Sequence, residues 1–359
     1  MPAAATISLS LLYSFQSADI QDVSQIHHLY PKCISPPITI LITNDHLAMA
    51  YDQFPLSVAL DDSIVQKMLQ DTLLHSRLTV IRTEYLPNHL HRICLVHLSN
   101  GSHLVLKLNP SPSTDLLRHE RYSLETEASV LALLTNSNIP APRTLGYDRK
   151  GTRLDSPFLI TTYLPGISYA DALPYLTSTE RREIELQLRS LSSIANRYIS
   201  PTFGPVALVA SNRGSVSWRD AFRFMVESVL MDGEDMMVNL PYIEIRKAVT
   251  SWGNALDEVR EARLVVLGLG RSENVLIDRR TNGVTGLLDF GQAVWGDPAL
   301  LEPDMCSGTK GLLYICYHAI IAIITNHYRP QRDAKELDAR KSLTATLAEL
   351  AVERECAKC

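Results

Sequence analysis

The sequence predicts an α+β protein with a small lobe that contains a sheet and a large lobe that is mainly helical. Three observations lead to this fold class. The 359 residues are 46% hydrophobic and 20% charged, which is enough to bury the core of one bilobal unit or of two domains. Strand patterns around a hairpin turn occupy residues 95–108, and helical patterns occupy much of residues 177–261.

The expected small lobe begins with a β-hairpin. Residues 95–98 and 103–108 flank Asn100-Gly101, a dipeptide typical of two-residue hairpin turns, and the second strand contains Lys107. A helix is expected at residues 125–134, because good helix formers there carry apolar side chains at helical spacing. Residues 158–166 form an apolar strand that ends in a Pro-Gly pair, where the lobe closes.

The expected large lobe starts with helices. Thr177 to Glu180 is a capping box that opens a helix to about Tyr198, and amphipathic helices are expected at residues 218–230 and 241–261. A second hairpin turns at Asn282-Gly283. The most hydrophobic run, residues 311–324, is too short to span a bilayer, which takes about 20 residues, so it is expected to be a buried core helix.

The chain before the first hairpin matches no known pattern, but it contains signals of regular structure. A strand is expected at residues 38–43 and a helix at residues 62–75, opened by Asp61-Asp62. We therefore expect an N-terminal extension at residues 1–80 that packs on the small lobe. The small lobe and hinge then occupy residues 81–165, and the helical large lobe occupies residues 166–359.

Charge and cysteine usage exclude several classes of partner. The net charge is −5 and no run of Lys or Arg is present, so neither nucleic acid nor an anionic membrane is expected as a partner. The six cysteines show no disulfide framework, and the first residues lack a basic region and a cleavage site. We expect a cytoplasmic protein with reduced thiols. The sequence does not specify its oligomeric state.

Residues 266–278 and 284–291 carry a family resemblance. They are similar to the metal-holding end of the active site in the aminoglycoside phosphotransferase-like (phosphotransferase enzyme) family, a small-molecule branch of the protein-kinase fold common in bacteria and filamentous fungi. The family motif reads His-Gly-Asp-Leu-His-Pro-Gly-Asn, of which Gly268 and Asn274 match. The Asp that receives the proton of the attacking hydroxyl falls on Leu269. The resemblance covers about residues 81–313 and implies a bilobal protein-kinase-like fold with a degenerate catalytic loop.

The same resemblance implies ligand-binding roles for particular side chains. Lys107 would contact the phosphates of ATP with Glu127 as its partner, and Tyr163 would lie at the adenine-contacting hinge. Asn274 and Asp289 would hold Mg²⁺ if a nucleotide binds. The alternative for Lys107 and Glu127 is a structural ion pair, and the alternative for Asp289 is a turn cap inherited with the fold.

Other residues point away from phosphate chemistry. The segment 85–92, where a phosphate-covering loop is expected, holds no glycine, so its backbone N–H groups form a poor cradle. Leu267 and Leu269 are expected to make the pocket floor apolar, which suits an apolar ligand. His89 and His91 share one face of a strand, as surface residues in the first instance or as a metal or proton-transfer pair.

Arg271 and Glu273 are charged residues in a loop that is uncharged in the family at these positions. They are candidate catalytic groups in a rebuilt site, or a solvated pair.

We interpret the chain as a phosphotransferase-fold protein without the catalytic Asp. It would bind a small apolar metabolite and cyclise or rearrange it, as a cyclase or pericyclase does, in fungal specialised metabolism. Loss of a positioned base costs about 10²–10⁴ in rate, whereas positioning alone accelerates a unimolecular ring closure. No cofactor is required for that chemistry. Two alternatives stay open: an ATP-dependent small-molecule kinase with an atypical site, which would use ATP and Mg²⁺, and a non-catalytic pseudokinase.

Overall fold

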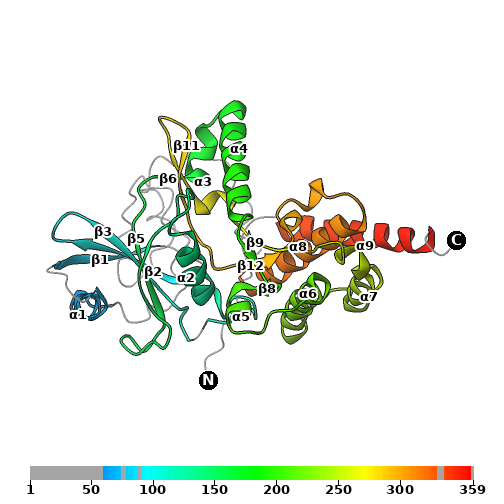
Figure 1. Ribbon diagram of the computed structural model, residues 1–359, viewed down its shortest axis with the longest axis horizontal. Coiled ribbons are helices and arrows are strands. Elements are labelled where there is room, and N and C mark those ends of the chain that lie inside the picture. Colours follow the sequence, from blue (N-terminus) through cyan, green and yellow to red (C-terminus); the bar gives the residue numbers. More distant parts are fainter. Residues whose placement is uncertain (1–59, 74–77, 87–89, 113, 330–334, 357–359) are drawn as a thin grey trace, which may run out of the picture. The chain divides into compact units, whose positions relative to one another are not determined.

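The computed structural model describes residues 60–73, 78–86, 90–112, 114–329 and 335–356 (Figure 1). The chain divides into two compact units, Met1–Leu56 and Ser57–Cys359, and every described residue belongs to the second. The strand expected at residues 38–43 therefore lies outside the described residues.

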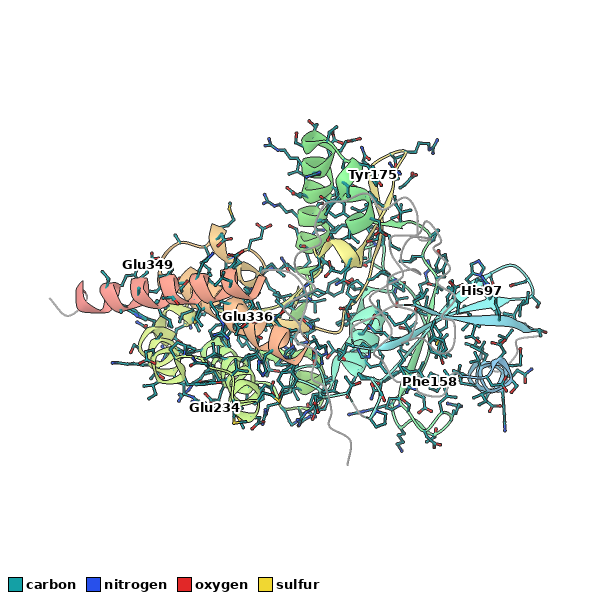
Figure 2. All side chains as sticks on the ribbon, turned by 180° about the vertical axis from the view of Figure 1, so that it is seen from behind. His97, Phe158, Tyr175, Glu234, Glu336 and Glu349 are labelled. Atoms are coloured by element: carbon teal, nitrogen blue, oxygen red, sulfur yellow. The ribbon has the colours of Figure 1, made fainter. Side chains whose placement is uncertain are left out.

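A five-stranded antiparallel sheet forms the small lobe. In sheet order its strands are β1 (Val80–Leu86), β2 (Arg92–Leu98), β3 (His103–Leu108), β5 (Phe158–Thr162) and β4 (Thr144–Asp148). The expected hairpin is confirmed, with β2 beginning three residues before residue 95. The central strand β3 pairs with β2 and β5, and this position holds the backbone of Lys107 rigidly between Ile93 and Leu159. Phe158 on this sheet is fully buried (Figure 2).

Helix α1 (Asp62–Leu73) belongs to the small lobe. It buries Val65, Met68 and Leu69 in the same apolar cluster as side chains of β2, β3 and β5. The helix expected at residues 62–75 is confirmed, since it begins at Asp62. This packing follows because an amphipathic helix of this length needs a neighbouring sheet to bury its apolar face. The boundaries at residues 80 and 165 stay predictions.

Helix α2 (Ser123–Leu134) joins the two lobes. Val130 and Leu131 are buried with Leu159 of β5 in the main core cluster, and α2 also contacts α5 (Figure 1). Its hydrophobic faces are therefore covered on more than one side, and Glu127 is carried into the interior with them.

The large lobe is mainly helical, as expected. Its helices are α3 (Tyr169–Ala172), α4 (Ser178–Ala195), α5 (Val206–Ala210), α6 (Trp218–Asp235), α7 (Tyr242–Trp252), α8 (Gly308–Tyr328) and α9 (Lys335–Cys356). The capping box of α4 is present: the N–H of Glu180 donates to Thr177 Oγ1 (3.3 Å), and the N–H of Thr177 donates to the Glu180 carboxylate (2.7 Å). Exposed acidic side chains such as Glu234 and Glu349 lie on α6 and α9 (Figure 2).

Two helix boundaries differ from the expectation. α6 runs on to Asp235, and α7 ends at Trp252 instead of continuing to residue 261. The end of α7 has a local cause, because Arg219 Nε donates to the carbonyl of Gly253 at 2.9 Å and satisfies a group at the helix terminus. The chain then makes a 3₁₀ turn (Gly253–Leu256) before the next strand.

Helix α8 has the length and apolar composition of a helix that could cross a membrane. The main core cluster buries Leu313, Tyr314, Ile320 and Ile324. Of the most apolar 18-residue stretch of α8, 56% is buried. Its packing is that of a core helix.

Two small sheets hold the segments that precede and follow residues 267–274 and 288–292. One has the order β11 (Gly283–Leu287), β10 (Val275–Asp278) and β6 (Ile167–Ser168), and the other the order β7 (Ile199–Ser200), β9 (Ala262–Val266), β12 (Ala293–Gly296) and β8 (Gly204–Pro205). The β10–β11 hairpin turns at Asn282, whose φ is 52°. The N–H of Leu288 donates to the carbonyl of Asn274 (2.8 Å), so Asn274 and Asp289 are held at the same end of this hairpin.

Candidate functional site

A buried charge cluster forms where the small-lobe sheet, α2 and the loop after β11 meet. Lys107 Nζ donates to the carboxylate of Glu127 and lies 3.4 Å from Asp289 Oδ1. The structure thus brings together three of the side chains singled out in the sequence. Burial disfavours the charge of Lys107, but the two carboxylates outweigh it and raise its pKa. Lys107 is therefore a permanent cation between two acids.

The two carboxylates have different environments. Burial raises the pKa of Glu127, whose side chain is only 8% exposed. The side chain of Asp289 is 39% exposed, and although burial opposes its charge, Lys107 lowers its pKa below the usual value. Asp289 is thus the ionised group of the cluster that has access to solvent.

The turn at residues 289–291 has an unusual backbone. Asp289 has a φ of 61°, in the left-handed region that costs a non-glycine residue about 1–2 kcal/mol. Phe290 is fully buried, and a Cβ on Gly291 would lie 3.1 Å from the backbone of Ser123. Tight packing against the start of α2 therefore holds Asp289 in this conformation.

His91 is buried beside the cluster and is not a surface histidine. Its Nδ1 lies 3.2 Å from the carbonyl of Leu108 and must donate to it, so Nε2 accepts from the hydroxyl of Ser123 at 2.9 Å. Burial, assisted by Lys107, lowers the pKa of His91 to about 3. The surface position expected for His91 is wrong, because its ring lies just before β2 and is buried between the carbonyl of Leu108 and the hydroxyl of Ser123. His89 lies outside the described residues.

The loop that carries the family's catalytic Asp is folded differently from the expectation of an apolar pocket floor. Gly268 has a φ of 82°, and the N–H of Leu269 donates back to the carbonyl of Val266 (3.3 Å). Leu269 is 3% exposed and belongs to the main core, whereas Leu267 lines a cavity. Of the two leucines, Leu267 alone can touch a ligand in that cavity.

The remaining predicted site residues are placed separately. Asn274 Nδ2 donates to the carbonyl of Gly268 (3.3 Å), which ties the two ends of the loop together. Arg271 and Glu273 are exposed and are not paired with each other in the described structure. Tyr163 is 38% exposed, and its ring meets His103 edge-on at 5.5 Å.

The donor set fits a magnesium nucleotide. Among the described residues no three His, Cys, Asp or Glu side chains form a metal cluster, but Mg²⁺ in nucleotide sites is bound by one or two protein groups together with phosphates and water. Asn274 and Asp289 would be those groups, and Lys107 would face the phosphates. Bound Mg-nucleotide would supply an electrophilic phosphoryl group.

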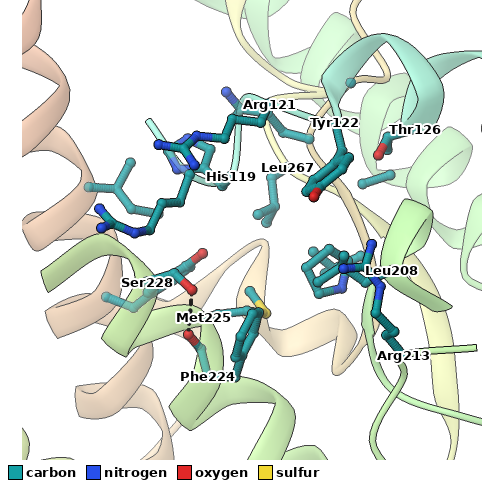
Figure 3. A pocket seen from close by; sticks show the side chains of 18 of the residues that line it. His119, Arg121, Tyr122, Thr126, Leu208, Arg213, Phe224, Met225, Ser228 and Leu267 are labelled. Atoms are coloured by element: carbon teal, nitrogen blue, oxygen red, sulfur yellow. Dashed lines mark hydrogen bonds between the residues drawn. The ribbon is translucent and has the colours of Figure 1, made fainter. Parts of the chain in front are cut away.

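A cavity of about 500 Å³ lies next to this cluster, between α2, α5, α6 and α8 (Figure 3). Most of its wall is apolar, and Leu267 and the chain after Asp289 contribute to it. The lining residues are Arg118, His119, Arg121, Tyr122, Thr126, Pro205, Leu208, Arg213, Phe224, Met225, Ser228, Met231, Leu267, Gly291, Gln292, Ala293, Val294, Tyr317 and Ile321. This volume is typical of pockets for small molecules.

Sequence reasoning missed most of the cavity. His119 is an example: burial lowers its pKa, and its buried Nδ1 has no hydrogen-bond partner among the described residues. The histidine lies between Arg118 and Glu120 in a stretch without strand or helix periodicity, so no local pattern marks it. His119 lines the cavity together with residues of α6 and α8, which are far from it in the sequence.

The sheet, the Lys107–Glu127–Asp289 cluster and the helical lobe together define a kinase-like phosphotransferase fold. The chain belongs to the phosphotransferase enzyme family, whose sequence profile matches residues 86–300. A search of curated proteins found no match.

Solved structures share the fold at low sequence identity. A thermostable mutant of aminoglycoside phosphotransferase APH(4)-Ia, in a ternary complex with AMP-PNP and hygromycin B, superposes with a TM-score of 0.56 at 16% identity, covering 79% of this chain and 97% of that one. A protein provisionally assigned as a fructosamine-3-kinase from Thermobifida fusca YX-ER1 has a TM-score of 0.55 at 14% identity, covering 80% of this chain and 98% of that one.

Proposed function

We propose that the protein binds a small, largely apolar molecule in the cavity beside Leu267 and does not act by base-assisted phosphoryl transfer. One observation supports this proposal: Leu269, which the family resemblance aligns with the catalytic Asp, is buried in the core. A carboxylate that receives a proton must lie within about 3 Å of the acceptor hydroxyl, and no side chain at this position offers one. The apolar cavity next to the cluster supports the choice of ligand.

The chemistry we propose is a cyclisation or rearrangement, of the kind catalysed by cyclases and pericyclases. A largely apolar cavity can hold a flexible substrate in a reactive conformation, and positioning of this kind accounts for several kcal/mol, up to roughly 7–11. Fungal specialised metabolism and a cytoplasmic location remain part of this proposal. Arg271 and Glu273 stay predictions as catalytic groups, and neither lines the cavity.

Magnesium-nucleotide binding is the second candidate, as a pseudokinase or as a small-molecule kinase with a relocated base. The geometry of Lys107, Glu127 and Asp289 favours it, because a buried ammonium beside a partly exposed carboxylate suits phosphates and Mg²⁺. The ATP analogue bound by APH(4)-Ia supports the same candidate.

Isothermal titration calorimetry of three proteins would test the proposal: the wild type, Ser228→Trp, which fills the cavity from α6, and Asp289→Asn, which removes the exposed carboxylate of the cluster. We expect the neutral probe 1-decanol to bind the wild type and Asp289→Asn but not Ser228→Trp. Mg-ATP binding that is lost in Asp289→Asn would support the second candidate. ATP consumption at about 1–100 s⁻¹, an ordinary kinase rate, would overturn the proposal.

A further inference from the structure

The charged residues around the cavity all have the same sign. Its lining includes Arg118, Arg121 and Arg213, and no described lining residue is Asp or Glu. Acidic residues outnumber basic ones in the chain, 39 against 34, so a purely basic lining does not follow from composition. The charged side chains in the described lining of this cavity are therefore all basic, in a protein of net negative charge.

One of these arginines is already neutralised. Arg118 donates to Asp232 (2.5 Å) and pairs with Asp235 (2.8 Å), two acidic residues at the end of α6 that do not line the cavity. Because these two ion pairs neutralise the charge of Arg118, this residue attracts an anionic ligand only weakly.

Arg121 and Arg213 are different. Arg121 is exposed and makes no hydrogen bond or ion pair with another described residue. Arg213 faces no carboxylate in the described structure, and its guanidinium carbon lies 5.6 Å from the centre of the Tyr122 ring. Arg121 directly precedes Tyr122 in the chain, and all three residues line the cavity, where the side chains of Arg121 and Arg213 approach it from different sides (Figure 3).

The interior of the cavity is apolar. Leu208, Met225, Leu267 and Ile321 line it, from α5, α6, the loop after β9 and α8. A ligand that fills this space buries an apolar body there and leaves its head group at Arg121 and Arg213. Guanidinium groups bind carboxylate and phosphate oxygens with paired, charge-assisted hydrogen bonds.

We propose that the ligand of this cavity is an amphipathic anion: an apolar body with a carboxylate or phosphate group that Arg121 and Arg213 hold. The inference rests on the proposed function, since it specifies the class of molecule that enters the same cavity. The two arginines select the sign of the head group, and the apolar wall selects the body.

Four probes with one ten-carbon chain test the inference by calorimetry: decanoate, decyl phosphate, 1-decanol and decylammonium, at about pH 8, where the acid is ionised and the amine protonated. We expect at least one anion to bind the wild type about 10-fold tighter than 1-decanol, since hydrogen bonds between a guanidinium group and an oxyanion are charge-assisted. Comparison of decanoate with decyl phosphate shows which oxyanion the arginines prefer.

Matched variants locate the effect. Arg121→Gln combined with Arg213→Gln should bring the anions to the affinity of 1-decanol and leave 1-decanol itself within about 2-fold, because the apolar contacts remain. Arg182→Gln is the control, since Arg182 is an exposed arginine on α4, which contributes no residue to the cavity. Urea unfolding of each variant checks that the fold is intact.

The outcomes separate the two proposals. If 1-decanol binds, binding is lost in Ser228→Trp, and the anions gain nothing over it, then the cavity binds apolar molecules and the anion inference is overturned. Tighter binding of decylammonium, or anion binding that survives the double arginine variant, also overturns it. If none of the four probes binds the wild type, the proposed apolar site itself fails, and the inference falls with it.

Discussion

Replacing Leu269 by Asp restores the residue type that the family motif places there, and it is the sharpest test of how this loop is built. If the loop were a kinase loop with one altered side chain, the new carboxylate would face an acceptor and phosphoryl transfer would increase. The structure indicates the opposite outcome. Leu269 is 3% exposed and packs in the main core, so the carboxylate would replace buried apolar surface.

The cost can be worked out from this burial. Removing a fully buried leucine side chain forfeits about 1.5–3 kcal/mol of apolar burial, and a polar group buried without a hydrogen bond costs about 1–3 kcal/mol by mutational data. The total of roughly 2.5–6 kcal/mol is a large part of the 5–15 kcal/mol that stabilises a typical domain. We therefore expect Leu269→Asp to unfold at much lower urea concentration than the wild type and to show no gain in ATP turnover.

The pH dependence gives this prediction a signature. Burial would raise the pKa of the new Asp in the folded state above its value of about 3.9 in the unfolded chain. The folded state would then hold the proton more tightly, so stability relative to the wild type falls as the pH rises from about 4 through the folded pKa. Leu269→Asn is the control, since it is polar and of similar size but carries no such pH dependence.

Urea denaturation at a series of pH values and an ATP consumption assay measure both effects. A Leu269→Asp protein that is as stable as the wild type and turns over ATP would refute the reasoning, because its carboxylate would then have to face solvent or substrate.

Two further predictions concern the charge cluster. Glu127→Leu leaves Lys107 in a buried site with Asp289 as its one carboxylate, and this should lower the free energy of unfolding by about 3–5 kcal/mol. The double variant with Lys107→Met should recover most of that loss. Strictly additive free energies of unfolding from urea titrations would contradict this coupling. His91 stays neutral in the fold because burial and Lys107 lower its pKa to about 3. Wild-type stability should therefore fall as the pH drops from about 6.5, by up to about 1.4 kcal/mol per pH unit, and His91→Gln should lose less stability over the same range. Equal pH dependence of the two urea midpoints would show that this burial is wrong.

Local signals predicted the parts of the fold that local interactions determine. The capping box at Thr177 and the turns at Asn100-Gly101 and Asn282-Gly283 depend on neighbours in the chain, and each lies where the sequence placed it. The Lys107 and Asp289 positions were found through family resemblance, since they lie 182 residues apart and no periodicity connects them.

Features that depend on tertiary packing escaped prediction. Leu269 was assigned to a pocket floor, but the positive φ of Gly268 directs it into the core, and a backbone conformation of this kind cannot be read from a motif that has lost its other residues. His91 was expected at the surface because alternation along a strand does not show which face is covered. The cavity needed α6 and α8, which line it together with the start of α2 although they are far apart in the sequence.

The Lys107–Glu127 pair argues more weakly for nucleotide binding than its geometry suggests. Loss of either partner leaves a buried charge uncompensated, at a cost of about 3–5 kcal/mol, so stability alone holds both residues in place. Asp289 is under no such constraint. Its side chain is 39% exposed to water, and its φ of 61° lies in the left-handed region, which Asp adopts more readily than most other non-glycine residues. This solvent-accessible carboxylate is therefore the part of the cluster that fold stability explains least. For that reason we place the decisive nucleotide test at Asp289 and not at Lys107.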